Sequence, residues 1–299
     1  MAEVHHFTYG AFNPVAAFLL AFLGSFFGLL CTDRARSART RGRRNRWLII
    51  ASFSIGGGGI WLMHFTAMLG FDVPASPVRY SIAMTSLSFV LAVATVGTGL
   101  MIVGHGRRRL PKVILAGVLT GGGVLAMHFS GMDGLHVSGV IHYNTTLAVA
   151  SVIIAVVAST VALWFAVSIR GWAPTAGAAA IMAIAVCGMH YTAMAATSVQ
   201  LKPVPPGGIT GLRPLTMIVP ITVITSLTIL GVALSALQAM TEEEFTDGAV
   251  TPRRGVHAEA TSWSLKQSTL NATRRTPGTR PSPRPIPLRS PAGSGPVGS

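Results

Sequence analysis

Apolar residues are gathered into seven long runs that are separated by short polar segments. A helix that crosses a membrane needs about 20 mostly apolar residues. Because lipid offers the backbone no hydrogen bonds, each run is predicted to be an α-helix. The predicted spans are residues 14–31, 47–70, 80–103, 111–132, 145–169, 173–198 and 215–238. The pattern therefore predicts an all-α polytopic membrane protein, a bundle of seven transmembrane helices.

The two ends of the chain differ from this apolar centre. Residues 1–13 contain no Lys or Arg, so we expect a short external segment and no cleavable signal peptide. Residues 14–240 form the predicted seven-span domain. Residues 241–299 are rich in Pro, Arg, Thr, Ser and Gly and hold few apolar residues, so this tail is predicted to be disordered. We expect no folded catalytic module in it.

Composition and charge support a membrane protein and give it a direction. The chain is 50% hydrophobic and 11% charged, whereas a soluble domain carries about 25% charged residues. Of its 23 Lys and Arg residues, 20 fall on one side of the predicted spans, and only Arg79, Lys202 and Arg213 fall on the other. Basic residues mark the cytoplasmic side. We therefore expect a multi-pass protein of the cytoplasmic membrane with its amino terminus outside and its carboxyl terminus inside.

The basic side consists of segments 32–46 and 104–112, Arg170 and the tail. Clusters of this kind beside membrane helices bind anionic lipid. Topology and lipid thus account for the formal net charge of +14, and no nucleic-acid partner is expected.

One six-residue pattern occurs three times, each time inside a predicted span. The copies are Met63-His64-Phe65-Thr66-Ala67-Met68, Met127-His128-Phe129-Ser130-Gly131-Met132 and Met189-His190-Tyr191-Thr192-Ala193-Met194. Each histidine lies 17 residues after the predicted start of its span, or about 25 Å at 1.5 Å per residue. The three motifs are therefore predicted at one depth, close to the external face, where three helices could point them at a common site.

The residue types in the motif indicate a soft metal ion. Within each copy the histidine and the second methionine are four residues apart, so they share a helix face, whereas the first methionine lies about 100° round the helix. Imidazole and thioether ligands suit Cu(I). The candidate copper ligands are Met63, His64, Met68, Met127, His128, Met132, Met189, His190 and Met194. Cys187 precedes His190 by three residues and could add a thiolate, and the external His5, His6, His136 and His142 could feed the site.

A purely structural role is the alternative for these residues. Methionine fills gaps in packing, and polar groups in membrane helices often only hold helices together. Duplication of a two-helix unit could copy such a feature. The glycines of residues 56–59 and 121–123, together with Gly177, predict close helix packing near the motifs.

The three motifs resemble those of the MHYT domain, a family of bacterial integral membrane sensors with seven spans and external motifs. The third copy reads Met-His-Tyr-Thr, the first has Phe65 in place of Tyr, and the second has Phe129 and Ser130. The resemblance covers about residues 10–240. It implies copper held by the His and Met residues of the motifs, and sensing of a diatomic gas such as oxygen, carbon monoxide or nitric oxide. Many members carry a cyclic-di-GMP, kinase or DNA-binding domain, which leaves an unknown cytoplasmic partner for the output here.

Three classes of function follow. The favoured one is a membrane sensor or binding module with a copper site near the outer face. A copper-handling or transport protein would need ligands that continue toward the cytoplasm, and no such series of His and Met is evident. A haem protein with bis-His ligation is compatible with histidines on neighbouring helices, but the methionines favour copper. An enzyme is not expected, because the spans contain no paired carboxylates or nucleophile–base arrangement.

Overall fold

The computed structural model describes residues 4–5, 7–107, 109–203, 209–217, 219–223, 226–227, 230–231 and 234. Within them, six helical segments are long and apolar enough to cross a membrane. The predicted all-α polytopic fold is confirmed. The predicted seventh span, 215–238, is described only in part and opens with the 3₁₀ turn η2, Pro214–Met217. The predicted disordered tail, 241–299, lies outside the described residues.

The six spans agree with the apolar runs but differ at their ends. They are α1 (Phe12–Ser37), a continuous segment of α2 (Arg41–Ser52), η1 (Phe53–Trp61) and α3 (Leu62–Met68), then α4 (Ile82–Gly104), α5 (Leu110–Asp133), α6 (Thr145–Ser168) and α7 (Trp172–Ala195). The basic segment 32–46 is not a loop, because α1 and α2 extend through it and leave only residues 38–40 between them. Arginine is a good helix former, so the helices continue beyond the apolar run.

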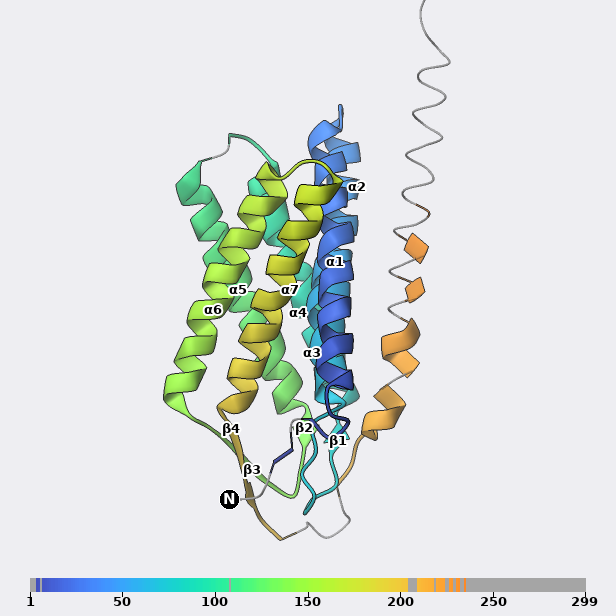
Figure 1. Ribbon diagram of the computed structural model, residues 1–299, viewed down its shortest axis with the longest axis vertical. Helices are drawn as coiled ribbons and strands as arrows, with labels where there is room; N and C mark the ends of the chain where they lie inside the picture. Colours follow the sequence, from blue (N-terminus) through green and yellow to red (C-terminus); the bar gives the residue numbers. More distant parts are fainter. Residues whose placement is uncertain are drawn as a thin grey trace, which may run out of the picture. The chain divides into compact units, whose positions relative to one another are not determined.

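The six spans form a ring in which the second span lies between α1 and α4. Along the ring α4 packs on α5, α5 on α6, α6 on α7 and α7 on α1 (Figure 1). The segment η1–α3 packs against both α1 and α4. In the most apolar stretch of the second span 83% of the residues are buried, against 22–56% in the other five spans. The second span is therefore the most buried of the six, and it carries the first motif.

Glycines in the π-helical segment let the second span approach its neighbours closely. η1 contains the four glycines of residues 56–59. A Cβ atom on Gly24 of α1 would lie 2.2 Å from the backbone nitrogen of Gly59, and one on Gly56 would lie 2.6 Å from the carbonyl oxygen of Ala92 on α4. The Ser54 hydroxyl also donates to the Gly24 carbonyl at 2.8 Å. The predicted close packing is thus confirmed here, whereas Gly177 has no atom near its Cβ direction and serves no such contact.

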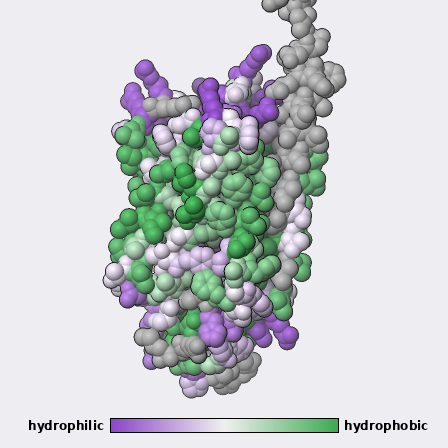
Figure 2. Space-filling view, viewed as in Figure 1, coloured by the Kyte–Doolittle hydropathy of each residue, from purple (hydrophilic) through white to green (hydrophobic). Residues whose placement is uncertain are grey.

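Short strands, which the sequence reading did not predict, join the segments that follow the motifs. β1 (Arg79–Tyr80) pairs with β2 (Leu135–His136), and β3 (Gly139–Tyr143) pairs with β4 (Thr197–Leu201), both antiparallel. Because β4 begins at Thr197, α7 ends at Ala195 and not at the predicted residue 198. The strands lie at the end of the bundle opposite the α1–α2 turn (Figure 1). Figure 2 shows an apolar band between two polar ends, as expected for a surface that faces lipid.

Candidate functional site

The three motif histidines meet inside the bundle. His64 comes from α3, His128 from α5 and His190 from α7, and each is at most 1% exposed. The Nδ1 atom of His64 lies 3.1 Å from Nδ1 of His190 and 3.2 Å from Nδ1 of His128. Ring centroids are 4.9–5.3 Å apart, and each pair of rings meets edge to face. The predicted convergence of the three histidines is confirmed.

The hydrogen-bonding needs of this cluster are not met by protein alone. A neutral imidazole has one N–H and one acceptor nitrogen. Nδ1 of His64 therefore cannot form full hydrogen bonds to both of its neighbours at once. The Nε2 atoms of His64 and His128 are also buried without a hydrogen-bond partner. Buried polar atoms are normally paired, and the three converging Nδ1 atoms, which cannot all satisfy one another, fit a metal ion as their common partner.

The ligand atoms of the three histidines lie within 4.8 Å of one another. Within the described residues, they form the group of His, Cys, Asp and Glu side chains that is close enough to hold one ion. Cys187, predicted as a further thiolate ligand, is outside this group. It packs instead beside Met63 and Ala183. The site is consequently neutral and built from imidazoles.

All six motif methionines are buried, with exposures of 0–3%. They do not share one environment. Met63 packs with Ala17, Ala21 and Ala183 between α1 and α7, and Met189 lines a cavity beneath the histidines. This agrees with the prediction that the first methionine need not face the site. The second methionines, Met68, Met132 and Met194, belong to the main core, as do Met127 and Met189. Their role as ligands stays a prediction.

The histidines that are predicted to be external lie in or beside the short strands, which form a cap on one end of the bundle. His5 pairs through its backbone with Asp72. The Nδ1 atom of His136 is 3.1 Å from the carbonyl oxygen of Thr210, and Nε2 of His142 is 3.2 Å from Oε1 of Gln200. These three do not join the buried cluster, and His6 lies outside the described residues.

The segment before α1 and the first turn of that helix cover the site at the strand end of the bundle. The Thr8 hydroxyl donates to the carbonyl of Gly70 at 2.9 Å, and the Asn13 amide donates to the carbonyl of Thr66 at 2.9 Å. The ring of Phe7 packs 5.6 Å from that of Tyr191, the residue after His190. The sequence reading missed this cover, because residues 1–13 carry no motif and their position depends on contacts with distant segments.

Two further residues that the sequence reading missed hold the motifs in place. Gly131 lies directly against His64, since a Cβ atom at this position would be 2.7 Å from Nε2 of that ring. The other two motifs have alanine at the same place, Ala67 and Ala193, and this difference was the available signal. The Tyr80 hydroxyl donates to the carbonyl of Met68 at 3.2 Å, and burial raises the pKa of Tyr80 so that the phenol stays protonated.

The fold and the cluster define a polytopic helical membrane protein with ionisable side chains buried between its spans. Residues 57–116 and 121–179 each match the MHYT model, described as a bacterial signalling protein N-terminal repeat. The resemblance to the MHYT family is thus confirmed, and the chain carries this repeat twice. Each matched segment contains one histidine motif, and the third copy follows the second match.

Similar proteins are bacterial signalling proteins. The bifunctional diguanylate cyclase/cyclic di-GMP phosphodiesterase MucR of Pseudomonas aeruginosa is 37% identical over 188 residues, which is 61% of this chain and 27% of MucR. The cyclic di-GMP phosphodiesterase NbdA of the same organism is 32% identical over 195 residues, 63% of this chain and 24% of NbdA. The signaling protein YkoW of Bacillus subtilis is 27% identical over 209 residues, 68% and 26% of the two chains.

The match thus spans about a quarter of the length of these relatives. No solved structure matches the chain. The part that the chain shares with MucR and NbdA is the membrane domain, which is a module of signalling proteins.

Proposed function

We propose that this chain is a membrane sensor module in which His64, His128 and His190 hold one copper ion near the outer end of the bundle. The observation that carries the proposal is the convergence of three buried histidines from three spans, with Nδ1 of His64 3.1 and 3.2 Å from the other two Nδ1 atoms. Ionisable residues inside a membrane are costly and mark functional sites by default. Their meeting at one point makes a ligand more plausible than three separate packing roles.

The donor set favours copper over harder ions. Imidazole ligands suit several transition metals, and thioether-rich surroundings select Cu(I). The cluster is wholly buried, it includes no carboxylate among the described residues, and six methionines lie in the motifs around it. A copper ion supplies one-electron redox chemistry and a coordination position for a small ligand. The three histidines would hold the ion in place, and the cover formed by residues 7–13 would exclude bulk water from it.

The geometry argues against the two other candidates. A haem with two histidine ligands lies as a flat ring between the two imidazoles. Here the imidazole centroids are 4.9–5.3 Å apart and the rings touch edge to face, so there is no room for a haem between them. A copper transporter needs successive ligands along a path. The cavity beneath the cluster is lined mainly by aliphatic side chains, with Met182 and Met189 as its soft donors. An ion held in place fits this arrangement better than an ion in transit.

The sensed signal is a diatomic gas or a change of redox state at the copper site. MucR and NbdA are named for synthesis or hydrolysis of cyclic di-GMP, and they share this membrane domain. In this chain the site would bias the packing of α3, α5 and α7, and a cytoplasmic signalling partner would read that change. The basic end of the bundle, with α1 and α2, is the surface available to such a partner and to anionic lipid.

Copper binding is tested on protein purified in lipid nanodiscs and loaded with Cu(I). Elemental analysis should give one copper ion per chain, and an absorption spectrum should lack the Soret band of haem. The triple variant His64→Ala, His128→Ala, His190→Ala should lose this copper, whereas His142→Ala in the outer cap should keep it. Unchanged copper content in a folded triple variant would refute the proposal.

A further inference from the structure

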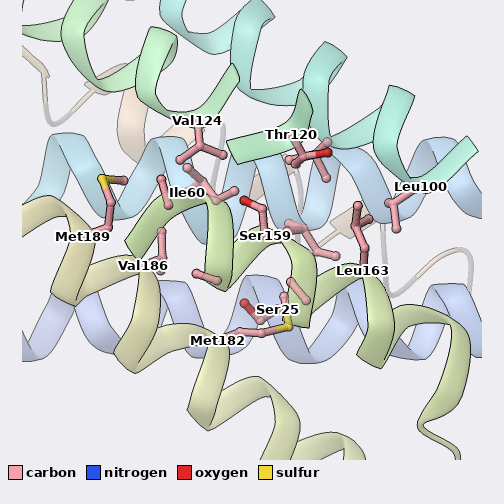
Figure 3. A pocket seen from close by; sticks show the side chains of 15 residues that line it. Ser25, Ile60, Leu100, Thr120, Val124, Ser159, Leu163, Met182, Val186 and Met189 are labelled. Carbon is pink, nitrogen blue, oxygen red and sulfur yellow. The ribbon is translucent and has the colours of Figure 1, made fainter. Parts of the chain in front are cut away.

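A cavity lies inside the bundle directly beneath the histidine cluster. It has a volume of about 60 Å³. Ile60, Val124 and Val186 line it, and each precedes a cluster histidine by four residues, that is, by about one helical turn. Figure 3 shows these three residues with Met189 toward one end of the cavity and Leu100 with Leu163 toward the other. A single layer of side chains thus separates the cavity from the histidines.

The chemistry of the walls favours a small apolar occupant over an ion. The lining is aliphatic apart from thioethers and the hydroxyls of Ser25, Thr120 and Ser159. A buried water needs two to four polar partners. Of the three hydroxyls, that of Thr120 is buried without a hydrogen-bond partner, so it is the wall atom at which a water would bind, and the aliphatic part of the lining offers a water no partner. Cavities with mainly aliphatic walls take up xenon or small apolar molecules.

The cavity reaches the seam between α6 and α7. Ala158, Ala162 and Val186 line it and are only partly buried, and the outer surface of these helices carries large exposed apolar side chains such as Val157 and Ile184. Small side chains at Ala155, Ala158 and Ala162 leave the space that larger residues would fill. An apolar solute dissolved in the bilayer therefore meets a short route to the interior.

We propose that this cavity is a binding site for a small apolar gas molecule, of the size of xenon or a diatomic gas, taken up from the lipid. The volume is too small for a lipid chain, and the walls offer no charge to an ionic ligand. Uptake by the cavity requires no metal. A role of the cavity as a store of gas molecules for the histidine cluster rests on the proposed function, in which the cluster responds to a diatomic gas.

The test is xenon binding to the metal-free protein in nanodiscs, measured by xenon-129 exchange NMR. Ala155 is 2% exposed and lines the cavity, so Ala155→Leu should fill the space and lower xenon binding severalfold. Leu163→Ala should enlarge the cavity and raise xenon binding. Ala94→Leu on the exposed face of α4 is the matched control and should bind xenon like the parent protein.

A folded parent protein that takes up no xenon, or an Ala155→Leu variant and a Leu163→Ala variant that both bind it like the parent, would overturn the inference. In copper-loaded protein, Ala155→Leu should also slow the association of carbon monoxide severalfold while the copper content stays unchanged. Unaltered association would refute the role as a store. Failure to load copper would instead count against the proposed function, and the xenon result would still decide the cavity.

Discussion

The Nδ1 atoms of His64 and His190 lie 3.1 Å apart although 126 residues separate them in the chain. His64 is also 3.2 Å from His128 by the same measure. It is thus the central member of the cluster, and it stands on the most buried span. If one ion is shared, each single His→Ala change should lower the copper affinity by at least the ~10–100-fold that loss of an outer-shell partner costs.

The same experiment distinguishes a shared site from independent ones. Titration of Cu(I) against a chelator should show His64→Ala to be the most damaging of the three variants, because it removes the ring that contacts both others. Loss of one third of the copper in each variant, with the remaining affinity unchanged, would mean that the motifs bind separately.

Gly131→Ala should disturb the cluster without removing a ligand. Its Cβ atom would lie 2.7 Å from Nε2 of His64, so the ring must move. We expect a severalfold lower copper affinity with the copper stoichiometry retained. Gly122→Ala on the same helix is the control, since no atom lies within 4 Å of its Cβ position. Equal affinities for the two variants would show that the approach of Gly131 to His64 does not position the ring.

Close contact between α1 and η1 should be needed for stability. In Gly24→Ala the new Cβ would lie 2.2 Å from the backbone nitrogen of Gly59. Overpacking of this kind costs about 1–3 kcal/mol, and thermal unfolding should occur at a lower temperature. Gly177→Ala meets no atom within 4 Å and should be neutral or slightly stabilising. A Gly24→Ala variant as stable as Gly177→Ala would contradict the close approach of the two backbones.

The features that depend on the composition of a single segment could be predicted from the sequence. Six spans, their approximate ends and the equal depth of the histidines follow from apolar runs and spacing. The π-helix of η1 could not be predicted, because four consecutive glycines have no side-chain periodicity. The pairing of β3 with β4 joins Gly139 to Leu201, a contact that local propensity does not encode. The separate environments of Met63 and Met189 depend on the rotation of each helix in the bundle, which the sequence alone leaves open.

The direction of insertion is a prediction that the fold makes easy to test. The α1–α2 turn at residues 38–40 and the strands β3 and β4 lie at opposite ends of the bundle. From the asymmetry of basic residues we expect residues 133–144 outside, and both the 38–40 turn and the tail inside. Topology reporters inserted at these places should give opposite signals. The same signal from residues 133–144 and from the turn would contradict the spans themselves, and exchanged signals would reverse the orientation.

The two methionines of each motif should differ in their effect on copper. Met→Leu keeps the volume of the side chain nearly constant and removes the thioether, so it tests ligation more than packing. Changing the second methionines, Met68, Met132 and Met194, should lower the Cu(I) affinity, because they share a helix face with the histidines. Changing Met63, Met127 and Met189 should have a smaller effect, since Met63 packs between α1 and α7 and Met189 lines the cavity. Both triple variants should be compared at matched thermal stability. If the change of Met63, Met127 and Met189 weakens copper binding more than the change of Met68, Met132 and Met194, the ion lies off the axis that the three histidines define. The proposed ligand set must then be revised.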